Sequence, residues 1–60
     1  MQLREIRKYR NLTQEQLAEK SGVKQETISA LELGKIKNPS YRIVVGLAKA
    51  LKVPPFNLEF

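Results

Sequence analysis

The sequence predicts an all-α fold, and three observations support this class. Apolar residues recur at helical spacing near both ends of the chain, in Leu3–Arg10 and in Tyr41–Leu51. Between them, the stretch Thr13–Gly34 holds two short helical patterns joined by a tight turn. The 60 residues contain no repeat, low-complexity tract or flexible linker, so we expect one small domain over residues 1–60.

The first predicted helix, Leu3–Arg10, is short and amphipathic. Thr13 predicts the N-cap of the second helix, because Gln16 follows three residues later and the two residues can form a capping box. The second helix is therefore expected to begin at about Gln14.

Gly22 predicts the turn between the second and third helices, since a turn this tight needs a residue that adopts a positive φ easily. Ala18 supplies a small side chain where the two helices cross. Ile28 and Leu31 continue the buried face on the third helix, and Gly34 is expected just beyond its end.

Ser40 predicts the N-cap of the fourth helix, Tyr41–Leu51. Two prolines then forbid its continuation, and Pro55 suits the first turn of a short last helix, Phe56–Phe60, with Leu58 pointing inward. The inward stripe of the fourth helix is predicted to contain Tyr41, Val44, Leu47, Ala48 and Leu51.

Four stretches carry a family resemblance: LTQEQLAEKSGV, TIS, LELGK and LAKALKV. With TQEQLAEKSGV followed at the right interval by TISxLExGK, the chain resembles the Xre/Cro-type, lambda-repressor-like helix-turn-helix family over nearly all of its length. The resemblance implies a compact five-helix domain in which helices two and three form the helix-turn-helix. It also implies binding to double-stranded operator DNA, usually as a two-fold symmetric dimer.

Long polar side chains near the start of the third helix suit base reading. A Gln side chain can bond adenine at N6 and N7, a Glu side chain can accept from cytosine N4, and an Ala methyl can contact only a thymine methyl. The predicted base contacts are Gln25, Glu26, Ser29 and Ala30.

In the family's docking, the start of the second helix and the loop after the third face the DNA backbone. Lys24 stands where many relatives have a capping hydroxyl, so it brings a cation there instead. Thr27 has two equal alternatives, a phosphate or the preceding turn of its own helix. The predicted phosphate contacts are Gln14, Lys24, Thr27, Lys35, Lys37 and Asn38.

The resemblance also implies a structural ion pair and a dimer. In the family, a basic residue at the place of Arg7 pairs with the glutamate of LExG, here Glu32, so we expect this pair rather than a solvated Arg7. Ile43, Phe56 and Phe60 are candidate contacts of a weak homodimer that DNA strengthens; for the two phenylalanines, covering the end of the core is an equal alternative.

Composition restricts the function further. Eleven Lys and Arg against six acidic residues give a net charge of +5, which suits a polyanionic partner. There is no Cys and no His, the only acid is Glu, and no nucleophile motif or Gly-rich phosphate loop occurs, so we expect no metal, cofactor, small-molecule ligand or enzyme activity. No apolar run reaches the roughly 20 residues that span a bilayer, so we expect a cytoplasmic protein with no membrane partner.

These observations favour a prokaryotic or phage transcriptional regulator, acting most often as a repressor by operator occupancy. An antitoxin, or a protein-interaction or coactivator module that uses the same fold without DNA, is the alternative. The salt dependence of binding distinguishes a DNA-binding protein from a protein-interaction module. Affinity for DNA falls steeply as the salt concentration rises, whereas apolar protein contacts depend mostly on buried area.

Overall fold

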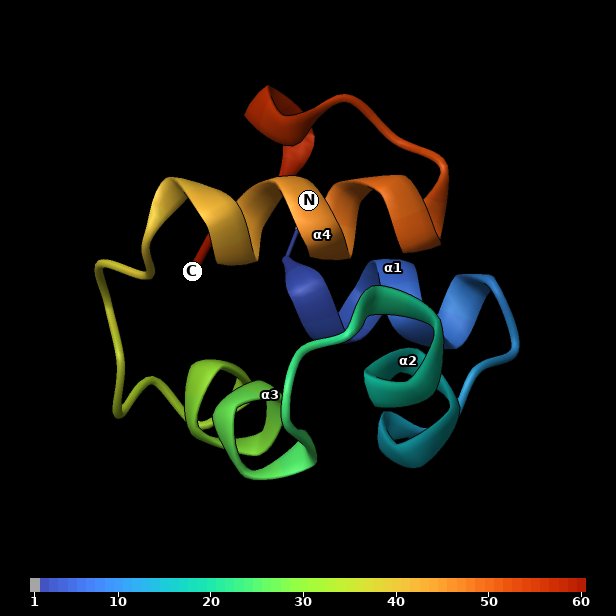
Figure 1. The fold of residues 1–60 in the computed structure, drawn as a ribbon, viewed down its shortest axis with the longest axis horizontal. Coiled ribbons are helices and arrows are strands. Elements are labelled where there is room, and N and C mark those ends of the chain that lie inside the picture. Colours follow the sequence, from blue (N-terminus) through green and yellow to red (C-terminus); the bar gives the residue numbers. More distant parts are fainter. Residues whose placement is uncertain (1) are drawn as a thin grey trace.

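The computed structural model describes residues 2–60, which form four α-helices and one short 3-10 helix (Figure 1). Helix α4 crosses the middle of the molecule, with the first three helices on one side and η1 on the other (Figure 1). The elements are α1 (Leu3–Tyr9), α2 (Gln14–Ser21), α3 (Gln25–Glu32), α4 (Tyr41–Leu51) and η1 (Pro55–Asn57).

Side-chain caps set the starts of α2 and α4. The backbone N–H of Gln16 donates to Thr13 Oγ1 at 3.0 Å, and the backbone N–H of Thr13 donates to Gln16 Oε1 at 2.9 Å. At α4, the backbone N–H of Ile43 donates to Ser40 Oγ at 3.3 Å. These bonds satisfy backbone groups that a helix start leaves unpaired, and both predicted starts are confirmed.

Two glycines end the central helices. Gly22 has φ 75° and Gly34 has φ 77°, a region in which a Cβ is strained. The backbone N–H of Gly22 donates to the Ala18 carbonyl at 2.9 Å and so closes α2. Both predicted positions are therefore confirmed.

The core lies between α4 and the first three helices. Its larger members Leu17, Ile28, Leu47 and Leu51 are fully enclosed, so α2, α3 and α4 converge on one cluster. Burial of each such side chain contributes about 1.5–3 kcal/mol before the cost of chain ordering. The buried apolar set is Leu3, Ile6, Leu17, Ile28, Leu31, Leu47, Ala48, Leu51 and Leu58.

A close backbone approach joins α4 to the end of α2. A Cβ placed on Gly46 would lie 3.1 Å from the Ser21 carbonyl oxygen, closer than about nine in ten real Cβ contacts. Ala18, predicted as the small residue of the helix crossing, packs half-buried against the core. Gly46 is therefore the position on α4 where a larger residue would press against the end of α2.

The prediction of a fifth helix, Phe56–Phe60, was wrong. Pro55–Asn57 make a single 3-10 turn, and Leu58 is already extended, with φ −88° and ψ 131°. Gln2 and Glu59 then pair in an isolated parallel bridge, which holds the end of the chain beside the start of α1. Burial of Leu58 with this extended backbone replaces the helix, because so short a segment nucleates a helix at high cost.

Tyr41 was also misplaced in the inward stripe of α4. It stands 76% exposed at the first position of the helix. Val44, which was predicted in the stripe, packs partly buried against the core, and so does Ile43, so the first turn of α4 covers the core with these two residues and leaves Tyr41 in solvent.

Candidate nucleic-acid interface

Helices α2 and α3 are held as one unit by the turn between them. Leu17 of α2 and Ile28 of α3 are both fully buried in the shared core. In the turn, the backbone N–H of Val23 donates to Ser21 Oγ at 3.2 Å. With both helices anchored, Ile28 of α3 is buried in the core, whereas Gln25 and Glu26 on its other side are exposed.

An open hollow on that side, here called the reading face, gathers residues from three elements. Its lining includes all four predicted base contacts, together with Gln14 from the start of α2 and Lys35 from the loop after α3. Leu33, 67% exposed at the end of α3, belongs to the same hollow and was not predicted. The reading face is lined by Gln14, Gln25, Glu26, Ser29, Ala30, Leu33 and Lys35.

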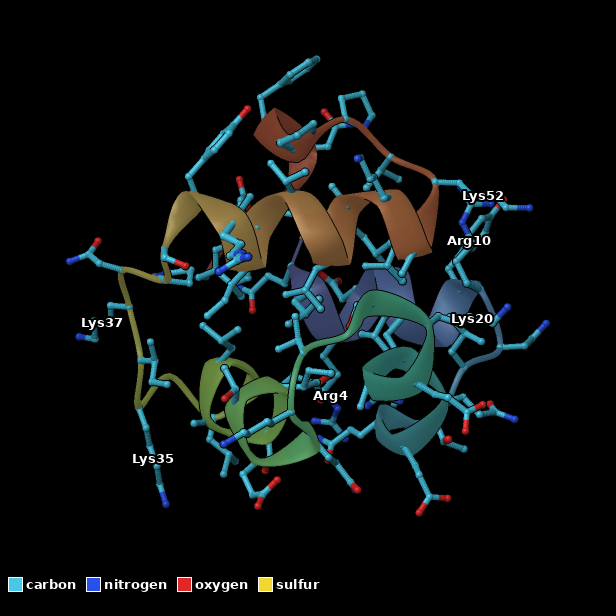
Figure 2. The ribbon with its side chains drawn as sticks, viewed as in Figure 1. Arg4, Arg10, Lys20, Lys35, Lys37 and Lys52 are labelled. Atoms are coloured by element: carbon cyan, nitrogen blue, oxygen red, sulfur yellow. The ribbon has the colours of Figure 1, made fainter. Side chains whose placement is uncertain are left out.

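The remaining predicted phosphate contacts lie elsewhere. Lys24 is the N-cap residue of α3 and makes no side-chain cap bond, because its ammonium group cannot accept a hydrogen bond. Lys24 and Thr27 border a different hollow, beside Arg42 and Ile43. Lys37 and Asn38 are exposed in the loop before α4. Figure 2 shows Lys35 and Lys37 pointing from this loop into solvent in different directions.

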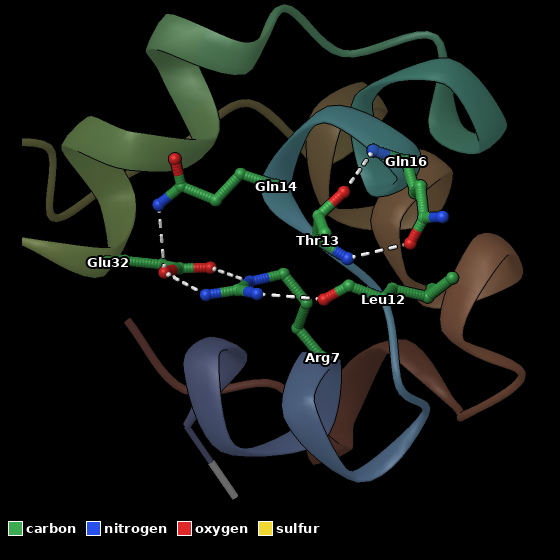
Figure 3. Close-up of polar contacts among 6 residues, drawn as sticks. All are labelled: Arg7, Leu12, Thr13, Gln14, Gln16 and Glu32. Atoms are coloured by element: carbon green, nitrogen blue, oxygen red, sulfur yellow. Dashed lines mark hydrogen bonds and ion pairs between the residues drawn. The ribbon is translucent and has the colours of Figure 1, made fainter.

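A buried ion pair between Arg7 and Glu32 lies next to Gln14 of the reading face (Figure 3). Arg7 Nε donates to Glu32 Oε2 at 2.6 Å, and a terminal nitrogen of Arg7 donates to Glu32 Oε1 at 3.0 Å. The other terminal nitrogen donates to the Leu12 carbonyl at 2.8 Å. The side chains of Arg7 and Glu32 are 10% and 4% exposed, so this two-bond contact joins α1 to α3 inside the fold.

Gln14 connects this pair to the reading face. Its Nε2 donates to Glu32 Oε1 at 3.1 Å. Burial alone would raise the pKa of Glu32, but hydrogen bonds from Arg7 and Gln14, with the charges of Arg7 and Arg4, bring that pKa below its usual value. The hydrogen bond to Glu32 raises the pKa of Arg7, so both groups are charged at neutral pH.

The three candidate dimer contacts have different surroundings. Ile43 and Phe60 are half-buried and pack against the core, whereas Phe56 is 85% exposed. Ile43 borders the hollow beside Lys24, and Phe60 borders another beside Arg4. Only Phe56 of the three therefore offers most of its surface to another molecule.

Two searches of residues 2–60 bear on other kinds of site. No group of three or more His, Cys, Asp or Glu residues that could hold a metal ion occurs among them. Among these same residues, none of the helices combines the length and the apolar composition that a bilayer crossing needs.

Sequence reasoning missed two residues at this interface. Leu33 lines the reading face but was assigned no role from the sequence. Arg4 borders a hollow with Gln14 and Ser29, although it belongs to α1. Its sequence signal is the three-residue spacing from Arg7, which places both residues on one side of α1.

Comparison with known proteins agrees with the helix-turn-helix arrangement of α2 and α3. A family model described as helix-turn-helix matches residues 3–58. The chain is 49% identical over 57 residues to the uncharacterized HTH-type transcriptional regulator RghRB of Bacillus subtilis, a match that covers 95% of this chain and 41% of that protein. No solved structure matches the chain significantly.

Archaeal proteins are similar to the same degree. An uncharacterized HTH-type transcriptional regulator of Archaeoglobus fulgidus is 49% identical over 47 residues, which cover 78% of this chain and 66% of that protein. One of Methanothermobacter thermautotrophicus is 49% identical over 49 residues, with 82% and 70% covered. The chain thus spans well under half of the Bacillus protein and about two thirds of these archaeal relatives.

Proposed function

Because the chain belongs to the helix-turn-helix family, we propose that it binds double-stranded DNA sequence-specifically and regulates transcription. One observation carries the proposal: the buried anchors of α2 and α3 leave Gln25, Glu26, Ser29 and Ala30 together on an open face. An α-helix that carries such residues fits the major groove, where each base pair presents a distinct pattern of donors and acceptors.

Each side chain has a distinct task in this proposal. Gln25 bonds adenine at N6 and N7, and Glu26 accepts from the exocyclic amine of cytosine. Ser29 supplies a hydroxyl that serves as donor or acceptor, and Ala30 gives a small apolar contact for a thymine methyl. The base pairs chosen therefore follow from four positions on one helix face.

The phosphate contacts position α3 in the groove. Gln14 donates one amide hydrogen to Glu32, and its second remains available for a phosphate oxygen. Lys35 and Lys37, with Asn38, grip the backbone on the other side of the groove, and Lys24 and Thr27 contact it near the start of α3. The net charge of +5 supports this partner, because each neutralised phosphate releases a counterion.

The regulator acts as a repressor by operator occupancy, in the cytoplasm, and binds as a weak homodimer that DNA strengthens. Phe56 carries the largest exposed apolar surface of the predicted contacts, whereas Ile43 and Phe60 are half-buried against the core. A single recognition helix reads only a few base pairs, whereas two related by a two-fold axis read half-sites about 34 Å apart. Neither a cofactor nor a small-molecule ligand is required.

Binding-site selection from random duplex DNA tests the proposal. We expect recovered duplexes to share two half-sites in inverted order, with affinity that falls steeply between 50 and 200 mM salt. A control variant, Gln25→Ala with Glu26→Ala, should lose the sequence preference but keep salt-dependent binding. Failure of the wild-type protein to enrich any sequence, with no salt-dependent binding, would refute DNA binding and favour a protein-interaction module.

A further inference from the structure

Arg4 of α1 lies beside residues of the helix-turn-helix. It borders a hollow of ≈ 220 Å³ whose lining comes from α1, from the start of α2 and from α3. Gln14, Ser29 and Leu33 line both this hollow and the reading face, so the two are continuous. Figure 2 shows Arg4 between α2 and α3, while Arg10, Lys20 and Lys52 gather at another edge of the molecule.

The charge of Arg4 is available to a ligand. Within residues 2–60, the Arg4 side chain is exposed and takes part in no hydrogen bond or ion pair, and its charge acts on Glu32 only through space. The neighbouring Arg7 is engaged by Glu32 and by the Leu12 carbonyl. Two guanidinium groups and one carboxylate line the hollow, so its net charge is +2 − 1 = +1.

The Glu32 carboxylate does not neutralise the charge that Arg4 presents to solvent. Its two oxygens accept three hydrogen bonds, from Arg7 and from Gln14, and its side chain is only 4% exposed. An anion that approaches the hollow from solvent therefore meets Arg4 before it meets Glu32. A guanidinium offers paired N–H donors that match two oxygens of a phosphate group.

We infer that Arg4 binds a DNA phosphate beside the reading face, so that the interface extends from the helix-turn-helix onto α1. The inference rests on the proposed function, because a duplex held in the reading face is what brings a backbone phosphate to this hollow. Arg4 contributes affinity without base preference, since a phosphate carries no sequence information.

The test measures how affinity for the selected duplex depends on salt. Each phosphate contact contributes about 0.9 to the slope of log affinity against log salt. Arg4→Gln should lower that slope by about 0.9, so that wild type loses about 3.5-fold more affinity than the variant between 50 and 200 mM salt. Arg4→Lys should keep the slope, and Arg4→Gln should leave the melting temperature and the base preference unchanged.

A second measurement locates the contact. Neutral methylphosphonates are placed one at a time along the duplex, and wild type should lose affinity at a position where Arg4→Gln loses nothing further. Lys52→Gln, which removes one charge at the edge away from Arg4, serves as the control and should retain every methylphosphonate response (Figure 2).

The possible results separate the two ideas. Sequence-specific binding by wild type with an unchanged slope in Arg4→Gln overturns the Arg4 contact and leaves the proposed function intact. A lower melting temperature in Arg4→Gln with an unchanged slope gives Arg4 a structural role beside Glu32 and also overturns the contact. No salt-dependent duplex binding by wild type overturns both.

Discussion

Removal of Glu32 should test how much the fold depends on its buried ion pair. Glu32→Ala removes both hydrogen bonds to Arg7 and the bond from Gln14. It leaves Arg7, a residue only 9% exposed, with the Leu12 carbonyl as its remaining partner. A stranded charge at such a position costs more than the lost bonds alone, because the guanidinium stays desolvated.

The expected loss is a large part of the total stability. Breaking a buried pair by removing one partner costs about 3–5 kcal/mol, and we expect about 3 kcal/mol because Arg7 keeps one partner and some solvent contact. A domain of this length has a total free energy of unfolding of about 3–9 kcal/mol. Because such a loss can unfold the domain, the stability of the milder variant Glu32→Gln is measured as well. This variant removes the charge but keeps an oxygen that can accept a hydrogen bond from Arg7.

A double-mutant cycle isolates the pair. Arg7→Gln, Glu32→Gln and the double variant are unfolded in urea and followed by far-ultraviolet circular dichroism, with the m-value checked for constancy. Two charge-assisted bonds predict a coupling energy of about 1.5–3 kcal/mol. Glu19→Ala, on the exposed side of α2, should change stability by less than about 0.5 kcal/mol. A coupling energy below about 0.5 kcal/mol would refute the reasoning.

Other expectations concern pH, DNA and assembly. The pKa of Glu32 is lower in the folded than in the unfolded protein, so the contribution of this carboxylate to stability should be complete above about pH 4.3 and lost as pH falls through the folded pKa. Urea titrations at several pH values check this expectation. Glu32→Gln should lack this pH-dependent part of the stability. Gln25→Ala or Glu26→Ala should cost about 1–3 kcal/mol on the selected duplex and relax one base pair each in binding assays on site variants. Lys35→Gln should lower the salt slope by about one, and an altered base preference would contradict its role. Phe56→Ser should weaken pairing of two heads on a palindromic duplex, as sedimentation measures, and unchanged pairing would leave Phe56 without a dimer role.

Local chemistry explains what the sequence predicted well. The Thr13–Gln16 capping box, the Ser40 cap and the positive φ of Gly22 each depend on residues within a few positions of one another. Such features depend on the local sequence rather than on tertiary packing. The helical stripes likewise placed Ile28, Leu47 and Leu51 correctly, because burial of one helix face follows its spacing.

Tertiary contacts decided the rest. The chain end remains extended because Glu59 pairs with Gln2, which is 57 positions earlier in the sequence. No local sequence pattern indicates that bridge. Gly46 needs to be small only because the Ser21 carbonyl lies against it. Arg4 borders the hollow next to the reading face only because α1 packs beside α3. Each depends on two segments distant in sequence, which periodicity within one segment cannot detect.

The reading face and the stability of the fold share the Glu32 carboxylate. On one side it binds Arg7 and so joins α3 to α1, and on the other it holds the Gln14 amide at the edge of the reading face. Helix α3 and the start of α2 therefore keep a fixed relation through one buried group rather than through the turn alone. A rigid relation matters for DNA recognition, because base contacts and phosphate contacts must be made at the same time. The arrangement explains why a charged residue can occupy an almost enclosed position in so small a core: its cost is offset by three hydrogen bonds that also position the surface proposed to meet DNA.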